Sequence, residues 1–268
     1  MSLKNLTLIL FSILFGYQSM AFDGVNPESN TWNNSPTEEK HLLDGIQARI
    51  EAAFVEALRQ KEMEPLLMLE RQIVAKRKEH EHRLLVYWQA YVDYYMSIAF
   101  LQLDDRKKAE KRIFKAIDRM ETVEQKSTED LALLAYAQSF SCQFRPGIVI
   151  PFISKKLRNN CKEAIALDSL NLRAYFVLGS NDFYTPEAFG GGKICEGMLL
   201  KAIALPEQKV ENAFLPSWGK MDAYELLIRW YIRKKEWKLA QKYYQEAIGQ
   251  YPQSYMIRKL AAKIEEKE

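Results

Sequence analysis

The chain of 268 residues has little of what most catalytic and metal sites are built from. It contains only three cysteines and three histidines, and their spacing suggests neither a zinc site nor a Cys/His nucleophile pair. No Ser/His/Asp arrangement is legible either. We therefore expect a protein that is not an enzyme and that uses neither a metal nor an organic cofactor.

The chain also lacks an excess of either charge. Its 38 basic and 35 acidic residues leave a net charge of only +3, without the concentrated basic field of a nucleic-acid-binding protein. We therefore predict no nucleic-acid partner. Eleven glycines and nine prolines are few for an all-β protein, whereas long stretches rich in Ala, Leu, Glu, Lys and Gln favour helix.

A conspicuous apolar run lies at the start of the chain. Lys4 precedes residues 6–17, an apolar stretch of about 12 residues, which is long enough for a signal peptide and too short to cross a membrane. Small residues at Ser19 and Ala21 predict cleavage after Ala21. Residues 1–21 are thus predicted to be a signal peptide, and the mature protein to be exported to the periplasm with no membrane span. An uncleaved anchor is the alternative.

The remainder is predicted to divide into a leader and one domain. Residues 22–36 are polar and rich in turn formers, so we expect a flexible leader there. Residues 37–268 are predicted to form a single α-helical repeat domain.

The three cysteines are Cys142, Cys161 and Cys195. An odd number in an exported chain allows one bridge and one free thiol, and Cys142–Cys161 is the pair to test. Cysteine is also simply a small core residue. We expect the three thiols to be buried and unpaired, and the sequence does not decide the point.

Apolar residues recur at the helical period from residue 37 onward. Thr37 and Thr128 are predicted N-caps, and Pro65 stands near a helix start, where proline is tolerated. Predicted insertions lie at 148–152 and 181–192, and 206–216 is a predicted loop. Beyond the helices that begin near Thr37, Pro65, Thr128 and Asn171, we predict helices over 83–103, 106–120, 155–167, 194–204, 221–233, 237–250 and 254–266.

The clearest repeated unit covers residues 221–252. Its characteristic side chains are Tyr224, Leu227 and Tyr231 on the first predicted helix, and Ala240, Tyr244, Ala247 and Pro252 on or just after the second. In this order and spacing they resemble a tetratricopeptide repeat. The resemblance implies a small residue at Ala240 where the helices cross closely, a gap between pairs filled by Tyr244, and a turn fixed by Pro252.

Looser units extend this resemblance over most of the chain from residue 42. Ala109 and Ala116, for example, repeat the spacing of Ala240 and Ala247. The resemblance implies an all-α fold of about four helix–turn–helix pairs, stacked in a short right-handed solenoid and closed by a C-terminal capping helix.

Residues 181–192, Asn-Asp-Phe-Tyr-Thr-Pro-Glu-Ala-Phe-Gly-Gly-Gly, carry a more particular likeness. They resemble a segment of exported tetratricopeptide-like proteins of Gram-negative bacteria. They are also similar to the T component of tripartite ATP-independent periplasmic transporters, which associates with a substrate-binding protein. We predict a turn at Gly190, Gly191 and Gly192 that lets the loop cross closely over a helix pair. Valine at Gly191 should resist a positive φ, and Phe183, Tyr184 and Phe189 should pack the loop down.

In the predicted register, one face of the first helices forms a concave groove. Its predicted lining combines aromatic, small polar and basic side chains: Tyr91, Tyr94, Tyr136, Ser139, Phe176, Ser180, Phe183, Arg229 and Arg233. Such a lining suits a peptide or an amphipathic anion. Ordinary packing between helix pairs is the alternative for each of these residues.

We therefore predict an exported, non-catalytic binding or scaffolding protein that engages a protein or peptide partner through the groove and the 181–192 loop. The alternative is a small-ligand-binding component of a periplasmic transport or uptake system. That alternative predicts an enclosed pocket with aromatic walls for a small hydrophobic or anionic ligand. The sequence specifies neither the partner, the oligomeric state nor the pathway.

Overall fold

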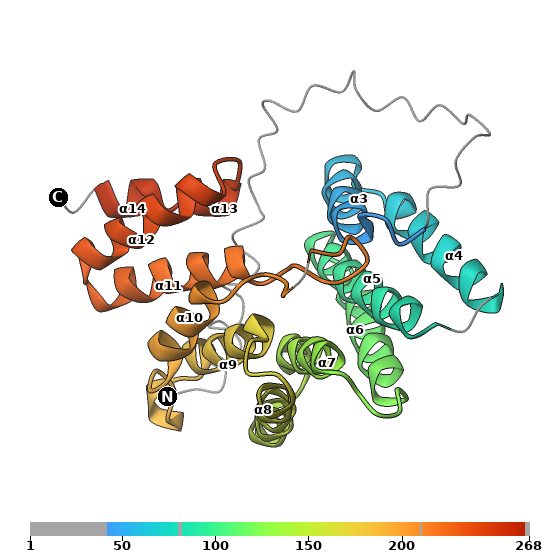
Figure 1. The fold of residues 1–268 in the computed structure, drawn as a ribbon, viewed down its shortest axis with the longest axis horizontal. Coiled ribbons are helices and arrows are strands. Elements are labelled where there is room, and N and C mark those ends of the chain that lie inside the picture. Colours follow the sequence, from blue (N-terminus) through green and yellow to red (C-terminus); the bar gives the residue numbers. More distant parts are fainter. Residues whose placement is uncertain (1–41, 80–81, 210, 266–268) are drawn as a thin grey trace.

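The computed structural model describes residues 42–79, 82–209 and 211–265, which contain helices and no strand (Figure 1). The predicted signal peptide (1–21), leader (22–36) and N-cap at Thr37 lie outside these residues. Among the described helices, none is long and apolar enough to cross a membrane. The α-helices are α3 (Ile46–Gln60), α4 (Glu64–Glu79), α5 (Arg83–Gln102), α6 (Arg106–Glu121), α7 (Thr128–Ser141), α8 (Ile150–Leu167), α9 (Leu172–Tyr184), α10 (Cys195–Ala204), α11 (Lys220–Lys234), α12 (Trp237–Gln250), α13 (Tyr255–Arg258) and α14 (Ala261–Glu265).

Helices pack mainly on their neighbours in the chain. α5 packs with α6, α7 with α8, α9 with α10, and α11 with α12. These pairs follow one another around an arc, with α3 and α4 at one end and α13 and α14 at the other (Figure 1). Their buried side chains form one continuous core cluster. Each pair therefore covers the apolar side of the next.

Short polar side chains start several helices and fix the turns between them. Ser127 accepts a hydrogen bond from the backbone N–H of Asp130, and the Asp130 carboxylate accepts one from the N–H of Ser127. The N-cap of α7 is therefore Ser127, not Thr128 as predicted. Asn171 and Asp105 cap α9 and α6 in the same way. Such caps satisfy N–H groups that have no partner within the helix.

Four predicted helix boundaries are wrong. The first helix was predicted to begin near Thr37, but residues 42–45 form a turn and α3 begins only at Ile46. α8 begins at Ile150, inside the predicted insertion, because Pro151 falls in its first turn, where a missing N–H costs nothing. α9 continues to Tyr184, so the first four residues of the predicted 181–192 loop are helical. It ends at Thr185, whose extended backbone is favoured by the proline that follows. The C-terminal region forms two short helices, α13 and α14, instead of one over 254–266.

The pair α11–α12 shows where the predicted repeat residues lie. Tyr224, Leu227 and Tyr231 are buried on α11, and Ala240 and Ala247 are fully buried on α12. Tyr244 is half-buried against the same core, and Pro252 lies in the exposed turn after α12.

All three cysteines are buried and free, as expected. Burial raises the pKa of the thiols of Cys142, Cys161 and Cys195 to about 12. No bridge therefore joins Cys142 to Cys161 in this structure.

The glycine turn is present, but its constraint differs from the prediction. Gly190 and Gly192 adopt positive φ angles of 86° and 76°, whereas Gly191 does not. A Cβ on Gly191 would instead lie 1.8 Å from the carbonyl oxygen of Thr185. Close backbone approach, not a left-handed conformation, therefore requires glycine there. Phe189 is 71% exposed and does not pack the loop down.

We expect Gly191→Ala to lower the free energy of unfolding by about 1–3 kcal/mol, because the backbone of Thr185 must move to admit the methyl group. Urea unfolding followed by circular dichroism measures the change. Gly197→Ala is the matched control, because the added Cβ meets nothing within 4 Å in α10 and alanine favours helix. Equal stability of the two variants would contradict this account of the turn.

Candidate binding site

Between α10 and α11, residues 205–209 and 211–219 cross the inner side of the arc toward α3 and α5 (Figure 1). Trp88 on α5 donates its indole N–H to the carbonyl of Phe214 at 3.0 Å. The backbone N–H of Ser217 donates to the side-chain oxygen of Gln47 on α3 at 2.8 Å. The described residues of the predicted loop 206–216 thus lie across the face that was expected to be an open groove. We call residues 205–209 and 211–219 the crossing segment.

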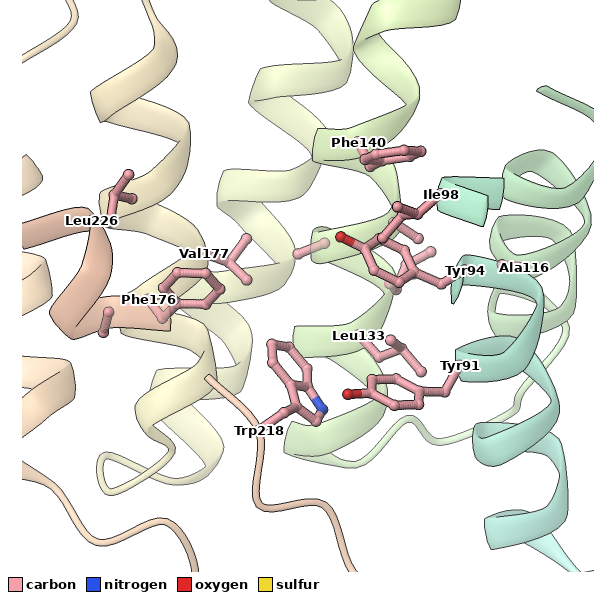
Figure 2. Close-up of a cluster of buried hydrophobic side chains, with 14 of the residues drawn as sticks. Tyr91, Tyr94, Ile98, Ala116, Leu133, Phe140, Phe176, Val177, Trp218 and Leu226 are labelled. Carbon is pink, nitrogen blue, oxygen red and sulfur yellow. The ribbon is translucent and has the colours of Figure 1, made fainter. Parts of the chain in front are cut away.

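Trp218, at the end of the crossing segment, fills one half of that groove. Its indole N–H donates to the Tyr87 hydroxyl at 2.8 Å. Its ring stacks on Tyr136, with centroids 5.0 Å apart and an interplanar angle of 18°. Figure 2 shows Trp218 lying between Phe176 and Tyr91. Tyr91, a predicted groove residue, is therefore only 1% exposed.

Arg173 on α9 holds the crossing segment in place. Its side chain is buried and forms two hydrogen bonds of 2.5 Å with the carboxylate of Glu129 on α7. It also donates to the carbonyls of Glu207 at 3.1 Å and Trp218 at 3.2 Å. Burial is the largest effect on Arg173 and acts to lower its pKa, but the charge and hydrogen bonds of Glu129, together with Tyr87 and Tyr91, outweigh it and the pKa is raised. The guanidinium therefore stays charged and joins α7, α9 and both ends of the segment.

The part of the groove that Trp218 leaves free is a cavity of about 110 Å³. One wall is aromatic, and its rings form a connected chain from α5 through α7 to α9. Tyr94 stacks on Tyr136 at 4.7 Å and meets Phe140 edge-on at 5.4 Å. Tyr136 in turn meets Phe176 at 5.6 Å. The polar groups that line the cavity are Ser139, Ser180, Tyr184, Asp222, Glu225 and Arg229.

Two of these polar groups are satisfied by each other. Arg229 pairs with Glu225 one turn earlier on α11, with 3.3 Å between Nη1 and Oε1. The same guanidinium donates to the Tyr184 hydroxyl at 3.1 Å. Burial raises the pKa of Glu225, and Arg229 opposes that shift. The ion pair thus leaves little charge facing the cavity.

Ser180 and Asp222, which also line the cavity, form no such side-chain pair. Ser180 is only 8% exposed, and within the described part of the chain its hydroxyl has no hydrogen-bond partner. Burial raises the pKa of Asp222 to about 7, and the nearby charges of Glu225 and Glu51 add to the effect. Backbone hydrogen bonds at the start of α11 only partly oppose it. Asp222 is only partly exposed, and a desolvated carboxyl beside like charges favours its neutral form, so Asp222 is half protonated near neutral pH.

The structure brings six predicted groove residues together around this cavity: Tyr94, Tyr136, Ser139, Phe176, Ser180 and Arg229. The other three lie elsewhere. Tyr91 is covered by Trp218, and Phe183 is buried beneath Arg233, whose guanidinium lies 3.8 Å above its ring. Arg233 donates to the Phe183 carbonyl at 3.0 Å, and neither residue lines the cavity. The groove is therefore divided into a filled half and a pocket.

Sequence reasoning missed four important residues: Arg173, Trp218, Asp222 and Glu225. The last two carry a local signal, because Asp222, Glu225 and Arg229 share one face of a helix at spacings of three and four. Trp218 and Arg173 carry none, since they meet only after the crossing segment has folded back.

A comparison with models of protein families, with curated proteins and with solved structures finds no match to this chain. Within residues 42–79, 82–209 and 211–265, no group of three or more His, Cys, Asp or Glu side chains could hold a metal ion.

We expect Glu129→Gln to lower the free energy of unfolding by about 3–5 kcal/mol, because it leaves the buried charge of Arg173 without its partner. Arg173→Met should lower it by about 1–3 kcal/mol, because the Glu129 carboxylate that it leaves unpaired is 24% exposed. The double variant should lose less than the sum of the two, by about 1 kcal/mol or more. Denaturant unfolding measures all three variants.

The matched control is Lys156→Met, which removes a surface pair with Glu121 and should cost under ~1 kcal/mol. Strict additivity of the two buried changes would show that the pair does not hold the segment.

Proposed function

We propose that this protein is a non-catalytic binding protein that holds a small organic molecule in the pocket between α5, α7, α9 and α11. The observation that supports it is a partly open cavity with an aromatic wall, in which Ser180 and Asp222 have no side-chain partner of the kind that joins Arg229 to Glu225. Aromatic walls with a few convergent polar groups are typical of small-molecule sites. This was the alternative function that the sequence suggested.

Two features of the inner face favour it over a peptide groove. The crossing segment and Trp218 occupy the path that an extended peptide would follow. The remaining cavity, about 110 Å³, is somewhat smaller than an engineered cavity of about 150 Å³ that binds benzene. The enclosed part of the ligand should therefore be about the size of one small ring or a branched alkyl group.

We further propose that the helix pairs are divergent tetratricopeptide repeats in a short right-handed array and that the protein is exported. The fully buried alanines Ala109, Ala116, Ala240 and Ala247 support the first point, since they stand where paired helices pack closely. The predicted signal peptide supports the second. A soluble ligand carrier in the periplasm, serving transport or uptake, fits both proposals.

A protein-binding role on the outer surface is the second candidate. Ile148 is 79% exposed and Phe152 is 74% exposed at the start of α8. Phe189 is similarly exposed in the 181–192 loop. Large apolar side chains held in water mark surfaces that contact other proteins. Site-specific crosslinking from position 189, with position 193 as the control, tests this role.

We expect a panel of small cationic, neutral and anionic compounds to contain at least one that raises the melting temperature of the wild-type protein by several degrees, because ligands that bind only the folded state stabilise it. Ser180→Phe should abolish that rise, because the ring fills the cavity. Asn159→Phe, on the exposed side of α8, is the matched control and should respond like the wild type. Equal responses in all three proteins would place binding outside the pocket.

A further inference from the structure

We propose that the ligand of this pocket is a small organic ammonium ion, whose nitrogen pairs with the Asp222 carboxylate while its carbon groups contact Tyr94, Tyr136 and Phe176. The inference rests on the proposed function, that the pocket binds a small molecule, and adds the chemical class of that molecule. Three features of the pocket carry it: its charge balance, its aromatic wall and one unpartnered hydroxyl.

The charge balance of the pocket is one positive charge short. Its lining has two carboxyl groups and one guanidinium. Arg229 is committed to Glu225 and to the Tyr184 hydroxyl. The charges that act most on Asp222 are those of Glu225 on α11 and Glu51 on α3, both negative. A ligand cation supplies the missing charge.

One nearby cation lies outside the lining: Lys263 on α14 acts on Glu225 and, like Arg229, favours its charged form. Tyr251, which follows α12, feels the charge of Asp222. Burial raises the pKa of Tyr184 on α9 to about 12, so its hydroxyl stays neutral at physiological pH. Asp222, with a pKa of about 7, changes its charge near neutrality.

The aromatic wall also favours a cation over an anion or a neutral molecule. Aromatic rings attract organic cations through the negative potential of their faces, and rings combined with a carboxylate are a recurring way to bind ammonium groups. An anion would meet two carboxyl groups, and a neutral molecule would leave Asp222 without a partner. The free hydroxyl of Ser180 offers an acceptor for an N–H or O–H group of the ligand.

The pocket also makes the affinity depend on pH. The pKa of Asp222 is about 7 in the free protein, and a cation binds its ionised form. Below this pKa the cation must displace a proton from Asp222, whereas above it the Asp222 carboxylate is already ionised. The ionised fraction rises from about one tenth at pH 6 to about nine tenths at pH 8, so the affinity should rise about tenfold over that range.

The test measures binding of benzylammonium and choline by titration calorimetry at pH 6, 7 and 8. Benzyl alcohol and 3,3-dimethylbutanol, which keep the shapes but lack the charge, are the matched neutral probes, and benzoate is the anionic one. At pH 8 we expect at least one ammonium ion to bind at least tenfold more tightly than its neutral counterpart. Asp222→Asn should lower that affinity at least tenfold and remove the pH dependence.

Asp118→Asn, on an exposed face of α6, is the control variant and should behave like the wild type. Asp222→Asn is expected to fold, because asparagine keeps the shape of a side chain that is already half neutral. The pH dependence of the wild-type protein tests the proposal without any variant.

Neutral or anionic probes that bind as tightly as the ammonium ions, with Asp222→Asn unchanged, would overturn the assignment and leave a pocket for another class of ligand. Failure of every ammonium probe at pH 8 would overturn it as well. The proposed function itself fails only if, in addition, no compound of any charge raises the melting temperature of the wild type more than that of Ser180→Phe.

Discussion

The ion pair between Arg173 and Glu129 determines which part of the inner face is covered and which part remains open. Helix pairs set around an arc leave an open face, and the crossing segment lies across it, held by Arg173. Two hydrogen bonds of Arg173 go to Glu129 and two to backbone carbonyls of the segment. A buried guanidinium is costly unless its charge and donors are all matched. Those matches exist only when the segment is in place, and with it comes Trp218.

The inner face holds charged side chains in two different arrangements, one fully paired and one not. Around Arg173 every charge is paired and the surroundings are filled. On α11, Arg229 and Glu225 neutralise each other, whereas Asp222 lies at the cavity with five aromatic rings, and the charges that act most on it are negative. Carboxyl groups with raised pKa values gather at functional sites. The unmatched charge of Asp222 is thus a feature of the pocket.

Local patterns in the sequence were sufficient for most of the fold. The bounds of α12 are those predicted. α5, α6 and α10 differ by one residue at one end and α11 by one residue at each end, because capping residues and helical periodicity act over a few positions. The end of α9 was wrong because Pro186, not the polar run before it, stops the helix. Concave positions inferred from the repeat spacing found Tyr94, Tyr136, Phe176, Ser180 and Arg229. The filled half of the groove could not be foreseen, since Trp218 reaches Tyr87 across 131 residues of sequence. The family likeness remains a prediction.

The most direct measurement is the number of protons released when the pocket is occupied. Calorimetric titration of the wild-type protein with benzylammonium at pH 7, repeated in buffers of different ionisation enthalpy, gives this number. The account predicts release of about half a proton per bound ion, because Asp222 is half protonated before binding and ionised after it. Asp222→Asn should release none. Binding without proton release, or with proton uptake, would contradict the claim that the unmatched Asp222 carboxyl is what the pocket offers its ligand.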